Sequence, residues 1–185
     1  MRRIVVFNRI SLDGFFAGPN GEIDWFIRDA DLDKAIHGTG RSDVLLMGRL
    51  TYQMFEAVWP KMAADPDAPK ELQATGQELN EMTKVVFSRT LKEVSWVNSR
   101  LLPGGVADEA RRLREGNGSD ILIFGSGSII QQLAPAGLID EYFLALTPAV
   151  LGVGKSMFTG VGRLSLKLVD SQAFASGNVL LHYRR

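Results

Sequence analysis

Residues 121–135 constrain the fold of this chain more than any other stretch, because they read as a buried strand that turns directly into a helix. Ile121–Phe124 is a run of four apolar residues, which is typical of a strand covered on both faces. Gly125–Gly127 then turns the chain, and apolar residues follow at helical spacing as far as Leu133. A buried strand followed by a helix is the repeating unit of α/β folds.

The turn in this stretch has two interpretations. Its glycines let the backbone approach a ligand closely, Ser126 or Ser128 can cap the helix, and the free N–H groups at such a junction attract phosphate. The dinucleotide-binding fingerprint, however, has a third glycine where this chain has Ile130. Many strand-to-helix turns need glycine for their geometry alone. A purely structural turn is therefore an equally good interpretation of this stretch by itself.

The rest of the chain repeats the alternation of strand and helix and then changes to an antiparallel pattern. The expected strands are Ile4–Phe7, Val44–Met47, Lys84–Arg89, a short piece at Trp96 and Val97, Leu138–Thr147, and a hairpin of Leu164–Phe174 with Asn178–Tyr183. The expected helices are Asp29–Ile36, ending near Gly38, a segment with Tyr52, Phe55 and Val58 at helical spacing, Lys70–Met82, and a surface helix with Ala107, Ala110 and Leu113. Ser11–Gly21 is expected to be a loop.

This order of elements predicts one α/β domain over residues 1–185. We expect a mostly parallel, twisted central sheet with right-handed crossovers, helices on both faces, and an antiparallel C-terminal hairpin.

Composition excludes several classes of function. The 21 basic residues equal the 21 acidic ones, so nucleic acid and anionic membranes are not expected partners. The chain has no cysteine and two histidines, His37 and His182, far apart in sequence, so no metal site is expected. No stretch approaches the roughly 18 apolar residues of a membrane span. The first apolar run stops at Phe7, too early for a signal peptide, so a cytoplasmic location is expected.

Several short segments together resemble dihydrofolate reductase-like proteins. Within that superfamily the chain is most similar to the reductase domain of the bifunctional riboflavin-biosynthesis deaminase-reductase. The resemblance covers essentially the whole chain, and the segments stand in the family's order. They are Ser11–Gly14, Met47–Tyr52, Phe87–Thr90, Gly125–Gly127, Gly137–Pro148, Leu151–Gly154 and Phe158. The zinc-deaminase signature of the riboflavin enzyme's other half is absent.

The resemblance implies that NADPH lies across the C-terminal ends of the strands, where open α/β sheets bind ligands. Arginine suits the oxygens of a 2′-phosphate, which favours NADPH over NADH. For Arg49 and Arg89, a surface arginine without a ligand is the alternative interpretation. The implied cofactor-binding residues are Gly48, Arg49 and Thr51 on the adenosine side, Ser88 and Arg89 at the 2′-phosphate, and Gly125, Ser126, Gly127 and Ser128 at the diphosphate.

On the substrate side the resemblance implies hydride transfer to a small heterocycle under the loop that follows the first strand. Phe16 and Trp25 are the implied substrate-binding residues, and Asp13 and Asp31 the candidate catalytic acids. Asp13 has an Asx turn as its alternative role. Asp31 stands one residue further from the tryptophan than the family's acid. On a helix this offset rotates a side chain by about 100°, which favours a capping or helix-dipole role for Asp31.

Three functions follow as hypotheses. The first is an NADPH-dependent reductase of the 5-amino-6-(5-phosphoribosylamino)uracil reductase type, acting on a small pyrimidine- or pteridine-like substrate. The second is an orphan or dihydrofolate reductase. The third is a non-catalytic nucleotide-binding domain that forms a dimer, because the last third of the chain is rich in apolar residues.

Overall fold

A computed structural model describes residues 1–37 and 40–185. Its elements are β1 (Ile4–Ser11), β2 (Phe15–Ala17), α1 (Ala30–His37), β3 (Ser42–Gly48), α2 (Arg49–Ala64), α3 (Lys70–Glu81), β4 (Thr83–Phe87), β5 (Ser99–Leu102), α4 (Val106–Glu115), β6 (Asp120–Phe124), α5 (Gly127–Leu133), β7 (Glu141–Thr147), β8 (Lys155–Ser156), β9 (Lys167–Ala173) and β10 (Val179–Arg184).

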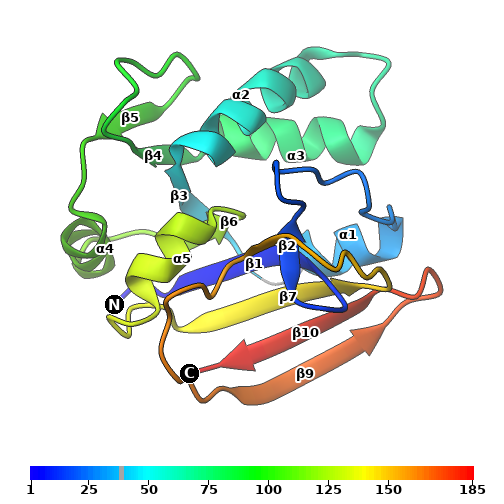
Figure 1. Ribbon diagram of the computed structural model, residues 1–185. Coiled ribbons are helices and arrows are strands. Elements are labelled where there is room, and N and C mark those ends of the chain that lie inside the picture. Colours follow the sequence, from blue (N-terminus) through cyan, green and yellow to red (C-terminus); the bar gives the residue numbers. More distant parts are fainter. Residues whose placement is uncertain (38–39) are drawn as a thin grey trace.

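Eight of these strands form one twisted sheet in the order β5-β4-β3-β6-β1-β7-β10-β9 (Figure 1). The six strands from β5 to β7 are mutually parallel, and β10 runs antiparallel to both β7 and β9. β2 and β8 form a separate two-stranded ribbon. The predicted fold class, a mostly parallel sheet with an antiparallel C-terminal hairpin, is confirmed.

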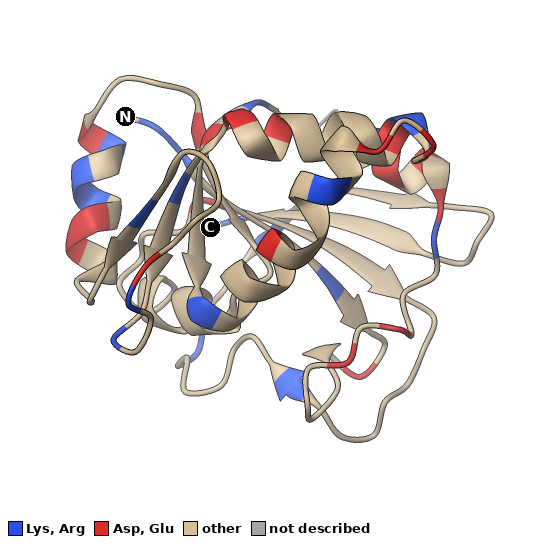
Figure 2. Ribbon diagram, turned by 90° about the horizontal axis from the view of Figure 1, so that it is seen from above, with Lys and Arg blue, Asp and Glu red and all other residues tan. Residues whose placement is uncertain are grey.

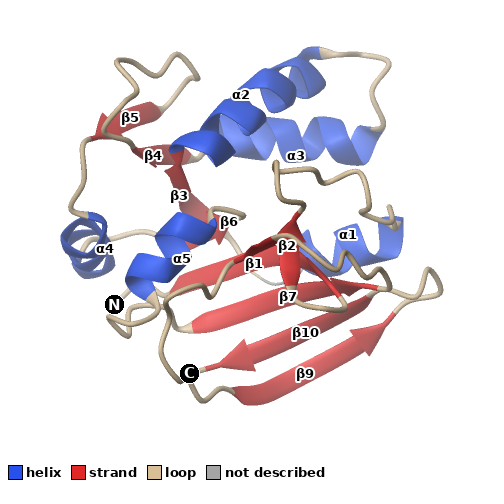
Figure 3. Ribbon diagram, viewed as in Figure 1, coloured by secondary structure: helices blue, strands red, loops and turns tan. Residues whose placement is uncertain are grey.

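Helices cover both faces of the sheet because successive side chains of each buried strand point to opposite sides. In β1, Ile4 and Val6 pack in one core cluster with α4 and α5, whereas Val5 and Phe7 pack with Leu32 of α1. A third cluster joins β3 and β4 to α2 and α3. The two helical layers on either side of the strands are visible in Figure 3.

Charges of both signs alternate along the surface helices. In Figure 2, acidic and basic segments follow one another along α4, where Arg112 pairs with Glu109 and Arg111 with Asp108. No helix in the described residues combines the length and the apolar character needed to cross a membrane.

Several predicted boundaries are wrong. Trp96 and Val97 are not a strand. Trp96 is buried, and its ring packs against the Lys84 side chain. Its backbone N–H donates to the Tyr52 hydroxyl rather than to a neighbouring strand. The strand β5 begins two residues after Val97. Val58 is exposed although it shares helical spacing with buried Tyr52 and Phe55.

Other corrections concern the ends of strands. The predicted loop Ser11–Gly21 contains the short strand β2, and the Lys84–Arg89 strand ends at Phe87. The pairing of Leu138–Thr147 begins only at Glu141, because the Leu138 N–H donates to the carbonyl of Leu133. The predicted helix end near Gly38 lies outside the described residues.

Candidate active site at the carboxyl edge of the parallel strands

Three turns meet at one edge of the sheet because they follow three adjacent parallel strands. β4, β3 and β6 are neighbours in the sheet. Gly48 at the end of β3 is in register with Phe87 of β4, and Leu46 of β3 is in register with Ile123 of β6. The turns that begin at Gly48, Ser88 and Gly125 therefore lie side by side at the C-terminal ends of their strands.

The turns after β3 and β6 are in direct contact. The backbone N–H of Gly48 donates to Oγ of Ser126 at 2.6 Å. A Cβ added at Gly48 would lie 2.7 Å from Oγ of Ser128, and one added at Gly125 would lie 3.4 Å from Cγ2 of Thr51. The close approach of the two serine hydroxyls explains glycine at position 48, whereas Gly125 is explained by its φ of +73°, in the left-handed region that favours glycine.

Ser126 does not cap α5 with its side chain, contrary to expectation. It occupies the position before the helix with φ +50°, in the left-handed region. Its hydroxyl oxygen instead accepts the hydrogen bond from the N–H of Gly48. Ser126 thereby ties the start of α5 to the start of α2.

The two arginines of the site are exposed and carry no acidic partner among the described residues. Arg49 is the first residue of α2 and donates to Oε1 of Gln53 at 3.1 Å. Arg89 follows directly on Ser88, whose Oγ accepts from the N–H groups of Thr90 and Leu91 at 3.1 and 2.9 Å. Because the Ser88 hydroxyl stabilises its own turn, Arg89 is held on a short, ordered loop.

Asp13 joins two loops. Its carboxylate accepts hydrogen bonds from the Ser11 hydroxyl at 2.6 Å and from the N–H groups of Leu151 and Gly152. The hydrogen bond from Ser11, with support from those of Gly152 and Leu151, lowers the pKa of Asp13. Asp13 is therefore a fixed carboxylate that connects the β1–β2 loop to the β7–β8 loop, rather than a local Asx turn.

Phe16 lies against the glycine turn. A Cβ added at Gly127 would come within 2.8 Å of the Phe16 ring and 3.6 Å of the Met157 Cα. Met157 is buried, and Phe16 packs on the core cluster that contains α5. The side chain of Phe16 thus forms an apolar wall beside Gly125–Gly127.

Trp25 and Asp31 are placed differently. The indole N–H of Trp25 donates to the carbonyl of Glu22 at 3.1 Å, and its ring stands edge-on to Phe26. Asp31 is exposed in the first turn of α1, 3.5 Å from Nζ of Lys34. The helix cap is Asp29, whose carboxylate accepts from the N–H of Asp31. Among the described residues, no hydrogen bond or ion pair links Asp31 to the three turns.

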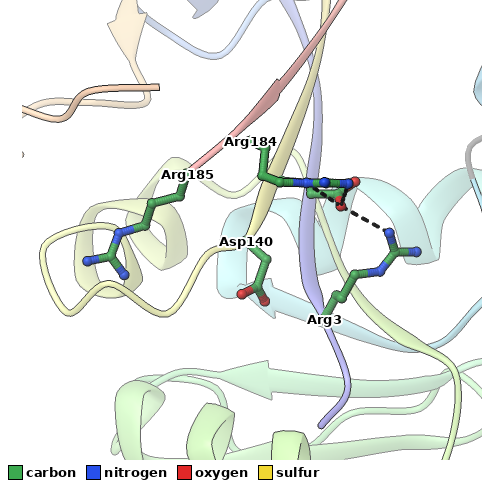
Figure 4. A pocket seen from close by; sticks show the side chains of 5 residues that line it. Arg3, Asp140, Arg184 and Arg185 are labelled. Atoms are coloured by element: carbon green, nitrogen blue, oxygen red, sulfur yellow. Dashed lines mark hydrogen bonds and ion pairs between the residues drawn. The ribbon is translucent and has the colours of Figure 1, made fainter. Parts of the chain in front are cut away.

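One hollow lies away from the three turns. A pocket of about 530 Å³ is lined by Arg3, Asp140, Glu141, Arg184 and Arg185, at the opposite edge, where β1 and β7 begin. Arg3 and Arg184 both donate to the Glu141 carboxylate, at 3.0 and 2.9 Å, and Figure 4 shows Arg185 pointing away from Arg3 and Arg184. The guanidinium groups of Arg3 and Arg184 already have a carboxylate partner, so this pocket is a weaker candidate for an anionic ligand than the three turns.

Among the described residues no His, Cys, Asp or Glu cluster could hold a metal ion.

A family model settles the affiliation of the chain. The model described as the RibD C-terminal domain matches residues 2–180. The chain belongs to the RibD C-terminal domain family. This family places it among riboflavin-pathway-like reductases, and the predicted resemblance is confirmed.

Relatives of this RibD C-terminal domain protein extend over its whole length. The uncharacterized Bacillus subtilis protein YyaP is 36% identical, with 98% of this chain and 94% of YyaP covered. A crystal structure of a Shewanella sp. PV-4 protein, whose name assigns it provisionally to riboflavin biosynthesis, is 25% identical. The match has a TM-score of 0.72 and covers 99% and 98% of the two chains.

A second similar structure is the Thermotoga maritima diaminohydroxyphosphoribosylaminopyrimidine deaminase/5-amino-6-(5-phosphoribosylamino)uracil reductase. It is 16% identical with a TM-score of 0.67, and the match covers 99% of this chain but 56% of the Thermotoga chain. At that identity the similarity shows the fold alone.

Sequence reasoning missed one polar residue at this edge of the RibD C-terminal domain. Asn8 lies on β1 beside the glycine turn and is buried. The signal was present, because Asn8 directly follows the apolar run of the first strand and continues the same strand.

Proposed function

We propose that residues 1–185 act as one NADPH-dependent reductase domain, which transfers hydride to a small pyrimidine- or pteridine-like heterocycle. A reductase of the 5-amino-6-(5-phosphoribosylamino)uracil type is the first candidate. The observation that carries this proposal is that the turns after β4, β3 and β6 lie side by side and offer two arginines that have no acidic partner among the described residues. Membership of the RibD C-terminal domain family supports it.

Each turn has a part in this proposal. Gly48, Arg49 and Thr51 face the adenosine side, and Ser88 and Arg89 hold the 2′-phosphate. Residues Gly125 to Ser128 take the diphosphate, with backbone N–H groups at the start of α5. The bound nicotinamide supplies the hydride.

The substrate side uses apolar walls. Phe16, which contacts Gly127, and Trp25 are the proposed substrate-binding residues. Asp13 positions the β1–β2 loop through its hydrogen bonds to Leu151 and Gly152. We leave Asp31 out of the site, because it lies at the surface beside Lys34.

The cofactor is tested by thermal unfolding with NADPH and with NADH. A ligand at 100 times its Kd adds about 2.7 kcal/mol of stability, so NADPH should raise the melting temperature well above the value with equimolar NADH. Arg89→Ala should abolish the preference for NADPH, and Arg111→Ala, on the exposed face of α4, should retain it. Equal shifts with NADPH and NADH would contradict the 2′-phosphate assignment.

The substrate is tested by measuring NADPH oxidation in the presence of 5-amino-6-(5-phosphoribosylamino)uracil, of dihydrofolate, or of other oxidised pteridines. Turnover of the ribosylaminopyrimidine alone supports the first candidate, and turnover of dihydrofolate or another pteridine supports an orphan or dihydrofolate reductase. Binding of NADPH without turnover of any of them would favour a non-catalytic nucleotide-binding domain.

Self-association is favoured by one feature. β9 is the last strand of the sheet, every residue in it is exposed, and Leu168 and Val169 are among them. An exposed strand edge of this kind readily pairs with another chain, so we propose a homodimer. Sedimentation equilibrium should give twice the 20.3 kDa mass of the chain.

A cytoplasmic location is part of the proposal and agrees with a chain without cysteine.

A further inference from the structure

Asn8 is a buried amide whose hydrogen-bonding capacity is almost unused. The residue is 4% exposed, and within the described residues its side chain makes one weak hydrogen bond, from Nδ2 to the Met157 sulfur at 4.0 Å. An asparagine side chain offers two N–H donors and a carbonyl acceptor. Buried polar groups are normally paired, so an amide with one weak bond inside the protein has capacity left for water or for a bound ligand.

Asn8 lies directly beside the glycine turn. Phe7 is in register with Phe124 on neighbouring β6, so the next residue, Asn8, stands opposite Gly125. The N–H of Gly125 donates to the carbonyl of Phe7 at 3.3 Å, which fixes the start of the turn against β1.

The surroundings of the Asn8 side chain are apolar and continuous with the turn. Its contact, Met157, lies close to Gly127, since a Cβ added at Gly127 would be 3.6 Å from Met157 Cα. The same added Cβ would be 2.8 Å from the Phe16 ring. The amide of Asn8 therefore stands close to a wall of Phe16 and Met157, a setting that suits a flat ring bearing one polar substituent.

The order of strands indicates which part of the cofactor comes here. In the proposed function the 2′-phosphate lies at the turn after β4, and the diphosphate at the turns after β3 and β6. A dinucleotide that continues in the same direction reaches β1, the next strand in the order β4-β3-β6-β1. With neighbouring strands about 4.8 Å apart, β4 and β1 are separated by about 14 Å. The nicotinamide ring is the part of the cofactor that lies beyond the diphosphate.

We propose that Asn8 binds the carboxamide of the nicotinamide ring. Its Nδ2 donates to the carboxamide oxygen, and its Oδ1 accepts from the carboxamide N–H group. This pairing orients the ring on the wall formed by Phe16 and Met157. The inference rests on the proposed function, because it requires that NADPH be the ligand, and it adds a cofactor-binding residue that the three turns do not contain.

The test uses Asn8→Leu and two ligands, measured by isothermal titration calorimetry. NADPH contains the nicotinamide, whereas 2′,5′-ADP has the adenosine and the 2′-phosphate without it. Asn8→Leu should bind NADPH at least tenfold more weakly, a loss of about 1.4 kcal/mol, and should bind 2′,5′-ADP within twofold of the unmodified protein. Its melting temperature should not fall, because leucine replaces an underpaired buried amide with an apolar group of similar size.

A second arm begins with the unmodified protein, and that part of it stands even if Asn8→Leu does not fold. The reduced 3-acetylpyridine analogue of NADPH keeps the carbonyl oxygen but lacks the carboxamide N–H groups. The unmodified protein should bind it more weakly than NADPH, and Asn8→Leu should bind the two alike.

The outcomes separate the two proposals. If the unmodified protein binds neither NADPH nor 2′,5′-ADP, the proposed function fails and the role of Asn8 fails with it. If it binds both, and Asn8→Leu binds NADPH equally well, the role of Asn8 alone is overturned. An equal loss of both ligands in Asn8→Leu, or equal affinity of the unmodified protein for NADPH and the acetylpyridine analogue, overturns it as well.

Discussion

Lys84 shows what a single side chain contributes to this fold. It is fully buried, although it was expected only as one residue of a short strand. Its Nζ donates to the carbonyl oxygens of Leu79 and Asn80, at 2.7 and 3.0 Å, and lies 4.5 Å from the centre of the Trp96 ring. Carbonyl groups in the last turn of a helix lack backbone partners, so Lys84 satisfies two of them at the end of α3.

The burial of Lys84 predicts an unusual dependence of stability on pH. Burial lowers the pKa of Lys84 to about 8, from 10.5 in the unfolded chain. Between these values the unfolded state binds more protons than the folded state, so the free energy of unfolding rises as the pH goes from 8 to 9.5. The rise is at most about 1.4 kcal/mol per pH unit for one group. Urea unfolding at several pH values measures it.

The control is Lys84→Met, which has no charge to titrate. Its stability should be flatter than that of the unmodified protein between pH 8 and 9.5. The same rise in both proteins would show that another group is responsible.

At the scale of elements, the contact between α5 and β2 shapes the site. Phe16 of β2 and Gly127 of α5 are so close that there is no room for a methyl group at position 127. A Cβ added there would lie 2.8 Å from the Phe16 ring. Because the helix begins where the ring packs, the position of Phe16 and the geometry of the Gly125–Gly127 turn are set together.

Gly127→Ala should disturb both elements. We expect a loss of about 1–3 kcal/mol in the free energy of unfolding, because an overpacked site forces its neighbours to shift. Weaker NADPH binding should accompany it. The matched control is Gly162→Ala, where an added Cβ meets nothing within 4 Å. Unchanged stability and binding in Gly127→Ala would refute the tight contact between α5 and β2.

At the scale of the molecule, Glu141 joins the parallel strands to the antiparallel hairpin. This buried carboxylate on β7 accepts from Arg3, which precedes β1, and from His182 and Arg184 of β10, at 2.9 to 3.0 Å. Burial raises the pKa of Glu141, but the hydrogen bonds from His182 and Arg184 and the charge of Arg3 outweigh it, and the net pKa is lowered.

Glu141→Ala should be destabilising, because it leaves three cationic or polar partners without their shared carboxylate. The Arg3 and Arg184 side chains are 46% and 56% exposed and are rehydrated once the carboxylate is lost, so the expected cost is about 1–3 kcal/mol, less than for a fully buried ion pair. Because the pKa of Glu141 is lower in the folded state than in the unfolded chain, its contribution to the free energy of unfolding is present at neutral pH. That contribution is lost as the pH falls through the folded-state pKa. Exposed Glu71→Ala is the control for urea unfolding at pH 7. Equal midpoints for the two variants would disprove the role of Glu141.

The sequence predicted the succession of strands and helices along the chain, and the three turns, because these depend on local patterns. Apolar runs such as Ile121–Phe124 mark buried strands, and glycine marks the turns that follow them. Contacts between distant residues leave no such pattern. The hydrogen bonds of Asp13 to Leu151 and Gly152, and the burial of Lys84 beside Trp96, depend on side chains that the fold alone brings together. Trp96 was mistaken for a strand for this reason.

The most direct test of the account is a titration of the ¹⁵N-labelled protein with NADPH, followed by the backbone amide signals. We predict that Gly48, Ser88 and Gly125, which stand on three separate segments, shift together with one Kd, and that Asn8 shifts with them. Amide shifts confined to the opposite edge, around Arg3, Asp140 and Arg184, or shifts in one turn without the other two, would contradict it.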